Sequence, residues 1–112
     1  MRIAVTYENG QIFQHFGHTE TFKIYDVEEG KVLHSEVVDT NGSGHGALAG
    51  VLNALNADVL ICGGIGGGAQ TALAAAGIKL FGGVSGDADK AVEAFINNTL
   101  YYNPDVNCAV LE

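Results

Sequence analysis

The sequence is poor in cationic residues, and this scarcity excludes some classes of partner. Only five of the 112 residues are Lys or Arg, against 13 Asp and Glu, which gives a formal net charge of −8. The five cations are scattered along the chain, so no basic patch is present to bind phosphate backbones. We therefore expect no nucleic acid partner and no attachment to an anionic membrane surface.

Long apolar runs are also missing. No stretch approaches the ~20 residues that a helix needs to cross a bilayer. The first residues do not follow the charged, apolar and small-residue order of a signal peptide, so we expect a cytoplasmic protein. Hydrophobic residues make up 47% of the chain and charged residues 16%. This composition supports one core, and we expect a single domain over residues 1–112.

Cysteine is scarce as well. The two cysteines, Cys62 and Cys108, form neither a disulfide framework nor a CxxC pair for zinc or redox chemistry. Cys62 stands at the end of an apolar run, and two interpretations are open. It is either a small core residue or a thiolate presented at the carboxyl end of a strand, close to the start of a helix.

The most distinctive stretch is Val59–Ala69, in which a short apolar run precedes five glycines. This pattern predicts a strand buried on both faces, a glycine loop and the start of a helix, a unit that often binds anions or cofactors. The segment Gly64–Ala69 also matches the G-x-G-x-x-A dinucleotide pattern. However, the chain is too short for both halves of a Rossmann domain. An alternative is that the glycines only let the helix pack closely on the sheet.

Hydrophobic periodicity predicts eight elements in the order β-β-β-α-β-α-β-α. The strands are expected at residues 2–7, 21–27, 32–38, 58–62 and 78–81, and the helices at residues 47–56, 70–76 and 88–97. Gly77 is expected just beyond the second helix, and Asp87 is expected to cap the third. Cys108–Leu111 is compatible with an extended segment.

This order predicts an α/β fold, in which one mixed sheet has helices on its faces and the second strand is antiparallel. Four loops would then meet at the carboxyl edge of the sheet, where open α/β sheets bind ligands. They comprise residues 8–20, 39–46, 63–68 and 82–87.

Three of the four histidines, His15, His18 and His45, fall in these loops. His15 and His18 flank Phe16-Gly17, and their neutral imidazoles suit iron, zinc, copper or nickel. With Cys62 at the same edge, the histidines predict an open metal or cluster site. His34 lies in the third strand, where we expect a structural or solvent-facing side chain. A hydrolytic site built on Cys62 and His45 is not favoured, because no nucleophile-elbow motif surrounds Cys62.

Several segments are similar to a known family. Gln14–Phe22 resembles the H-F-G-x-x-x-x-F signature of the dinitrogenase iron–molybdenum cofactor biosynthesis family (NifX, NafY and the C-terminal part of NifB). His45-Gly46-Ala47 and Ala57–Gly66 are similar to its short histidine–glycine segment and its A-D-V-v-x-x-G-I/M-G segment. The resemblance extends through Gly77–Leu80 and Gly82–Phe95, and so covers roughly residues 1–100.

The resemblance implies a three-layer α/β/α, ribonuclease-H-like fold with a five-stranded mixed sheet in the order 3-2-1-4-5. It also implies non-enzymatic binding, carriage or delivery of an iron–sulfur or iron–molybdenum-type cluster, with cluster-assembly proteins as partners. The family's cluster-contacting histidine corresponds to His15. Nuclease activity is not implied, because the acidic nuclease constellation is not recognisable.

A cluster carrier is therefore our leading hypothesis. The expected metal ligands are His15, His45 and Cys62. His18 and the backbone of Gly64 and Gly66 are expected to complete the cluster-binding site, since backbone N–H groups bind anions. Two alternatives are a small-molecule or nucleotide-binding regulatory module that uses Gly63–Gly68, and a protein-interaction adaptor.

Overall fold

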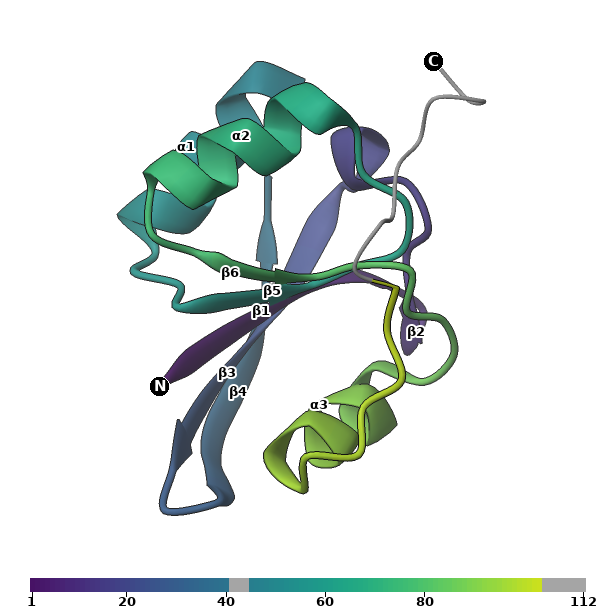
Figure 1. Cartoon of the computed structure of the whole chain (residues 1–112). Helices are drawn as coiled ribbons and strands as arrows, with labels where there is room; N and C mark the ends of the chain where they lie inside the picture. Colours follow the sequence, from purple (N-terminus) through teal and green to yellow (C-terminus); the bar gives the residue numbers. More distant parts are fainter. Residues whose placement is uncertain (41–44, 104–112) are drawn as a thin grey trace.

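The computed structural model describes residues 1–40 and 45–103, without the side chains of residues 45 and 46. These residues form a mixed sheet, three α-helices and one short 3-10 helix, η1 (Figure 1). The elements are β1 (Arg2–Glu8), β2 (Gln11–Ile12), η1 (Phe16–His18), β3 (Thr21–Glu28), β4 (Lys31–Asp39), α1 (His45–Ala54), β5 (Val59–Ile61), α2 (Gly67–Ala75), β6 (Lys79–Phe81) and α3 (Ala88–Ile96). The predicted mixed α/β fold is confirmed. The extended segment expected at residues 108–111 lies outside the described residues.

The main sheet has the order β4-β3-β1-β5-β6, and β2 pairs with the end of β1. Strand β3 is antiparallel to both of its neighbours, β1 and β4, whereas β1, β5 and β6 are mutually parallel. The sequence did not predict β2, because two residues are too few to show an alternating pattern. The turn at Asn9-Gly10 forms this small hairpin, and both residues have the positive φ that such a tight turn requires.

Helices cover both faces of the sheet (Figure 1). On one face α1 and α2 enclose a core that includes Phe16, Phe22, Leu48 and Leu73. On the other face α3 packs over a second core, built largely from the alternate residues of the same strands. In β3, for example, Ile24 enters the first core and Tyr25 the second, because successive strand residues point to opposite faces.

The helix ends follow local chemistry. Helix α2 begins at Gly67, three residues before the predicted start, because glycine gives no helical signal in a sequence. Its end agrees with the prediction. Gly77 has φ +76°, and the N–H groups of Gly77 and Ile78 donate to the carbonyls of Ala74 and Leu73, as in a Schellman motif. Helix α3 is capped by Asp87, whose Oδ1 accepts from the Lys90 N–H at 2.9 Å.

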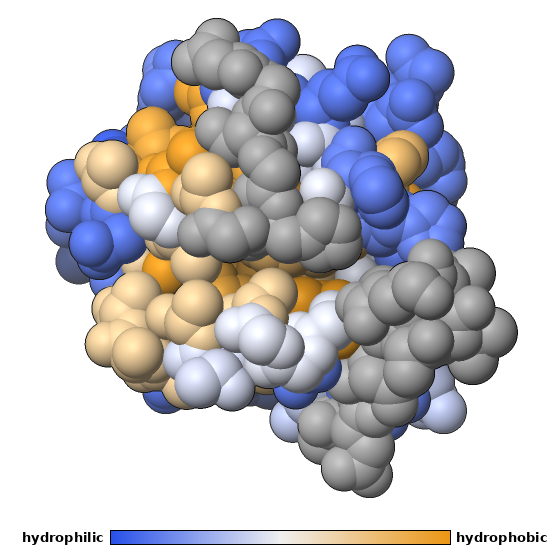
Figure 2. Space-filling view, turned by 90° about the horizontal axis from the view of Figure 1, so that it is seen from above, coloured by the Kyte–Doolittle hydropathy of each residue, from blue (hydrophilic) through white to orange (hydrophobic). Residues whose placement is uncertain are grey.

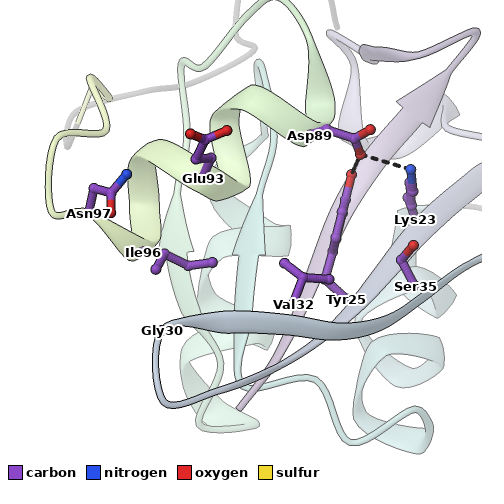
Figure 3. Close-up of a pocket in the computed structure, with 9 residues that line it drawn as sticks. All are labelled: Lys23, Tyr25, Gly30, Val32, Ser35, Asp89, Glu93, Ile96 and Asn97. Atoms are coloured by element: carbon purple, nitrogen blue, oxygen red, sulfur yellow. Dashed lines mark hydrogen bonds and ion pairs between the residues drawn. The ribbon is translucent and has the colours of Figure 1, made fainter.

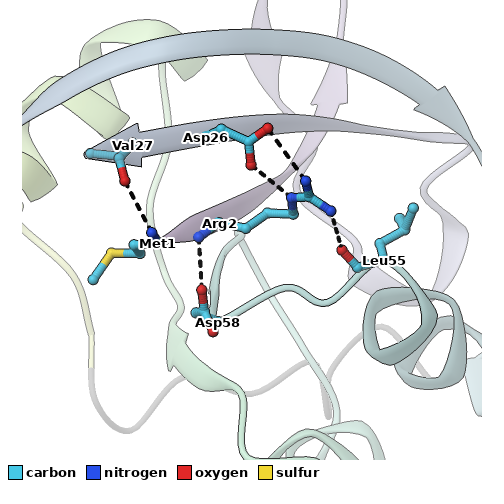
Figure 4. A network of polar contacts seen from close by, with 6 residues as sticks. All are labelled: Met1, Arg2, Asp26, Val27, Leu55 and Asp58. Carbon is cyan, nitrogen blue, oxygen red and sulfur yellow. Dashed lines mark hydrogen bonds and ion pairs between the residues drawn. The ribbon is translucent and has the colours of Figure 1, made fainter.

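A network of hydrogen bonds surrounds the amino-terminal end of β1 (Figure 4). The Arg2 guanidinium donates from Nε to Asp26 Oδ1 at 2.7 Å and from Nη1 to the Leu55 carbonyl at 2.7 Å. The Arg2 backbone N–H donates to Asp58 Oδ2 at 2.8 Å. The network ties β1 to β3 and to the segment between α1 and β5, at the end of the sheet away from the histidine loops. Within the described part of the chain, no helix has both the length and the apolarity needed to cross a membrane.

Candidate functional site

Three loops at the carboxyl ends of β1, β5 and β6 are joined by backbone hydrogen bonds. We call this region the rim, and it comprises residues 9–20, 62–66 and 82–87. The Phe16 N–H donates to the Gly64 carbonyl at 3.0 Å, and the Gly64 N–H donates to the Gln14 carbonyl at 2.6 Å. On the other side, the Gly83 N–H donates to the Gly63 carbonyl at 2.9 Å. Three of the four loops predicted to meet at this edge therefore do so, and most of the fourth, residues 39–46, lies outside the described residues.

Gly63 makes this junction sterically possible. A Cβ atom on Gly63 would lie 2.7 Å from Gln14 Cα, a backbone atom that cannot move aside cheaply. The Gln14 side chain is fixed in turn, because its Nε2 donates to the carbonyls of Ile12 and Val84 at 3.0 and 3.1 Å. Gly63 therefore permits close packing between two loops, a different contact from the predicted packing of the helix on the sheet.

His15 lies directly on this junction. It forms a parallel β-bridge with Gly64, and its side chain is half-buried. Its ring meets the Phe13 ring edge-on, with 6.1 Å between centroids and an interplanar angle of 81°. The next residue, Phe16, is fully buried in the core and packs against Phe22. Phe16 thus anchors the loop, and the imidazole of His15 is held beside the glycine loop.

His18 is more exposed than His15 and lies at the end of η1. It borders a cavity of about 380 Å³ that is also lined by Tyr7, Phe13 and Glu20. His45 is the first residue of α1, and α1 packs against η1. The position of the His45 side chain lies outside the described structure, so only its helix can be placed beside the histidine loop.

Cys62 is fully buried in the core beneath α1 and α2, and its Sγ lies 3.6 Å from the Gly63 carbonyl oxygen. This position favours the core-packing interpretation over the ligand interpretation. Among the residues that the structure describes, no group of three or more His, Cys, Asp or Glu side chains could hold a metal ion.

The glycines at the start of α2 differ from Gly63. Gly66 is the N-cap residue, and no side chain caps the helix. Gly67 and Gly68 are exposed, and a Cβ atom at either position would meet nothing within 4 Å. Packing therefore does not require glycine there. The N–H groups of a first helical turn lack partners within the helix and attract anions. The Gly64 N–H, by contrast, donates to the Gln14 carbonyl in this conformation.

A cavity of about 520 Å³ lies away from the histidine loop, between α3 and the β3–β4 hairpin (Figure 3). Within it, the Tyr25 hydroxyl donates to Asp89 Oδ1 at 2.5 Å, and Lys23 Nζ donates to the same oxygen at 2.8 Å. Burial and the neighbouring carboxylate raise the pKa of Tyr25. Hydrogen bonds from Lys23 and Tyr25 lower the pKa of Asp89. The sequence placed Lys23 and Tyr25 on one face of a strand, but only the fold brings Asp89 to them.

The surface over α1 and α2 is weakly apolar. Viewed from above, it shows tan and orange areas between hydrophilic margins (Figure 2). Its exposed helical residues include the alanines Ala72, Ala74 and Ala75. These methyl side chains cannot ligate a metal or transfer a proton. The rim, in contrast, carries imidazole side chains.

Comparisons with known proteins agree with the loop pattern. A family model described as "Dinitrogenase iron-molybdenum cofactor" matches residues 1–98. An uncharacterized protein of Methanocaldococcus jannaschii, MJ0580, is 26% identical in an alignment of 106 residues, with coverage of 89% of this chain and 89% of that protein. The crystal structure of PH0822 is similar, with a TM-score of 0.88, 30% identity and coverage of 94% of this chain and 96% of the other.

The apo form of the orange protein from Desulfovibrio gigas is also similar. Its TM-score is 0.83 and its identity 30%, and the match covers 96% of both chains. The family match spans β1 to the end of α3 and includes the histidine loop, the glycine loop and the start of α1. The chain therefore belongs to the dinitrogenase iron–molybdenum cofactor family.

Proposed function

We propose that this protein binds and carries an iron–sulfur or iron–molybdenum-type cluster as cargo, without catalysing a reaction, and passes it to cofactor-assembly proteins. The observation that carries the proposal is the pairing of His15 with Gly64. This pairing holds a half-buried imidazole beside the uncapped start of α2, in a member of a family named for a metallocluster.

The two groups have complementary chemistry. A neutral imidazole is a good ligand for iron and copper, whereas backbone N–H groups bind the anionic sulfur or oxygen atoms of a cluster. Gly67 and Gly68 leave the N–H groups of the first turn of α2 open to a bulky ligand. The net charge of −8 opposes an anionic cargo over long distances. Affinity must therefore come from short-range ligation and hydrogen bonds at the rim.

His15 is the proposed principal ligand. His18 and His45 are proposed as secondary ligands, since η1 and α1 are in contact. Gly66 is proposed to contribute to the cluster-binding site as the N-cap residue of α2. Gly64 is proposed to contribute by holding the backbone of His15 in place through their β-bridge. Cys62 would ligate only after a rearrangement that exposes its thiol, because it is fully buried in the present conformation.

The test is anaerobic reconstitution with iron and sulfide, with and without molybdate, followed by absorption spectroscopy and metal analysis. We compare the wild type with His15→Ala. The matched control is His34→Ala, which removes an exposed imidazole from β4, away from the rim. A visible chromophore is expected in the wild type and the control, and its loss or clear weakening in His15→Ala. Equal chromophores in all three proteins, or none in any, would refute the proposed ligand.

The proposal extends to the architecture and setting of the protein. We place the sheet in the ribonuclease-H-like class, because its strand directions and order suit that class. We also treat residues 1–112 as one cytoplasmic domain. Limited proteolysis tests the single domain, since a second folded unit would yield a separate stable fragment.

The main alternative is a small-molecule or nucleotide-binding module that uses Gly63–Gly68. In its favour is the uncapped first turn of α2. Against it, Gly63 is covered by Gln14, and the Gly64 N–H is already bonded, so the first half of the loop has little room for a phosphate. Thermal-shift measurements with a nucleotide panel separate the two ideas. A marked rise in Tm with one nucleotide would support the alternative.

A further inference from the structure

Strand β4 is a long and exposed edge of the sheet. It spans nine residues and pairs only with β3 among the described strands. Every residue of β4 is exposed except Val38, which is partly buried. Three apolar side chains are unusually open, with relative exposures of 44% for Val32, 64% for Leu33 and 49% for Val37. An edge of this kind is a ready template for another strand.

The opposite edge is shorter and better covered. Strand β6 has only three residues. The Phe81 ring of β6 packs against Phe95 and Tyr102, with centroids 5.0 and 4.8 Å away. Just beyond β6, the Asn103 N–H donates to the Gly82 carbonyl at 2.8 Å. Short length and side-chain cover are common ways of protecting a sheet edge. Within the described part of the chain, one edge is therefore protected and the other is open.

We propose that β4 is a self-association surface, on which two copies of this chain pair antiparallel about a twofold axis at Ser35. The two sheets would then form one continuous sheet across the dimer. Such an interface uses the same strand from both copies, so every contact occurs twice. Main-chain hydrogen bonds between the two edges would supply affinity, and side-chain pairs would set the register.

The residue order of β4 is self-complementary about Ser35. In an antiparallel pair centred there, His34 lies opposite the partner's Glu36, and Glu36 lies opposite the partner's His34. Outside them, Leu33 faces the partner's Val37, and Val32 faces the partner's Val38. At the ends, Lys31 meets a carboxylate, Asp39 of the partner. Cross-strand pairs of these kinds stabilise a sheet, whereas like charges placed opposite each other destabilise it.

The bulge in β4 does not remove this complementarity. The β3–β4 register shifts between Asp26 and Val27, so that His34 pairs with Asp26 and Val32 with Val27, leaving Leu33 as the extra residue. If Leu33 also stays out of the new pairing, Val32 comes opposite the partner's Val37. Val32 then still faces an apolar residue and the central pairs of His34 and Glu36 are unchanged, whereas Lys31 comes opposite the partner's Val38 in place of Asp39. The proposal therefore holds for either arrangement.

The test is sedimentation equilibrium of the cluster-free protein over a concentration series reaching about 1 mM, which suits a weak dimer. We expect a species of twice the monomer mass of 11.6 kDa at high concentration. Glu36→Lys removes the carboxylate from both central pairs and places a cation opposite each imidazole, and should weaken the dimer about tenfold. The double variant His34→Glu/Glu36→Lys restores opposite charges and should recover the dimer.

The control is Glu93→Lys, the same charge change at an exposed position on α3. It should leave the dissociation constant close to that of the wild type. Hydrogen exchange gives a second measurement, because amides of residues 31–39 should become more protected as concentration rises. A monomer at every concentration, or equal weakening by Glu36→Lys and Glu93→Lys, would overturn the proposal. Neither result bears on cluster binding, which involves the rim.

Discussion

Gly63 tolerates no side chain, because its missing Cβ leaves the space that Gln14 fills. We expect Gly63→Ala to lower the free energy of unfolding by about 1–3 kcal/mol, since the backbone at Gln14 must shift. Gly67→Ala offers the contrasting case. A Cβ atom there meets open space, so this change should raise the free energy of unfolding by about 0.5–1 kcal/mol.

Urea denaturation of both variants measures these differences. If Gly67 and Gly68 are glycine to admit a ligand, Gly67→Ala should also weaken reconstitution while it stabilises the fold. A Gly63→Ala protein as stable as the wild type would contradict the steric argument.

The phenol of Tyr25 should ionise at unusually high pH. Burial and its hydrogen bond to Asp89 favour the neutral form and raise its pKa. A group whose pKa is higher in the folded state stabilises the fold at pH values below its unfolded pKa of 10.0, and this stabilisation is lost as the pH rises through the folded pKa. Ultraviolet titration of the wild type minus that of Tyr25→Phe isolates this phenol. Ionisation near pH 10 would show that the hydroxyl is not held as described.

At the scale of single elements, the start of α3 depends on one side chain. Asp87 accepts a hydrogen bond from the Lys90 N–H, which otherwise has no partner within the helix. Replacing a capping residue with Ala costs about 1 kcal/mol, so Asp87→Ala should lower the stability by that amount. Asp87→Asn should keep most of the wild-type stability, because the side-chain oxygen of Asn can still accept the hydrogen bond from the Lys90 N–H. Urea midpoints of the two variants test the cap, and equal losses in both would contradict it.

Element types were easier to predict from the sequence than element ends. The alternation around Phe22 and Ile24 marked a strand, and Gly77 and Asp87 marked helix ends through ordinary local chemistry. The start of α2 was missed because Gly67 and Gly68 have no helical preference of their own. They are nevertheless the first two residues of α2, a start that no local preference predicts.

At the scale of the whole molecule, two aspartates make stability sensitive to acid. Arg2 lowers the pKa of Asp26, and Lys23 and Tyr25 lower the pKa of Asp89. A group whose pKa is lower in the folded state stabilises the fold above its ordinary pKa, here 3.8, and this stabilisation is lost as the pH falls through the folded pKa.

We therefore expect the urea midpoint to fall between pH 5 and pH 3, about the range in which paired aspartates become protonated. Asp26→Asn should be less stable than the wild type at neutral pH, and its midpoint should fall less on acidification. Because both aspartates are partly exposed, the effect should also shrink in high salt. Parallel acid profiles for the wild type and Asp26→Asn would contradict this role.

The candidate site was only partly visible in the sequence. The convergence of loops followed from strand order, and it brought His15 to the glycine loop. Sequence reasoning could not decide whether Cys62 faced the core or the rim, because the end of a buried strand permits either. The contact of Asp89 with Lys23 and Tyr25 joins residues more than sixty positions apart. A pattern of neighbouring residues in the sequence cannot predict a contact over this distance.

The network around the first residues has a practical consequence for attachment chemistry. The Met1 amine donates to the Val27 carbonyl at 3.0 Å, and Arg2 is fixed at the end of the sheet away from the rim. By contrast, the described chain ends at Asn103, which is bonded to Gly82 beside the rim. A sensor surface or fluorescent label coupled through the amino terminus would therefore leave the histidine loop facing solution. An attachment at Asn103 would instead lie beside the rim that is being measured.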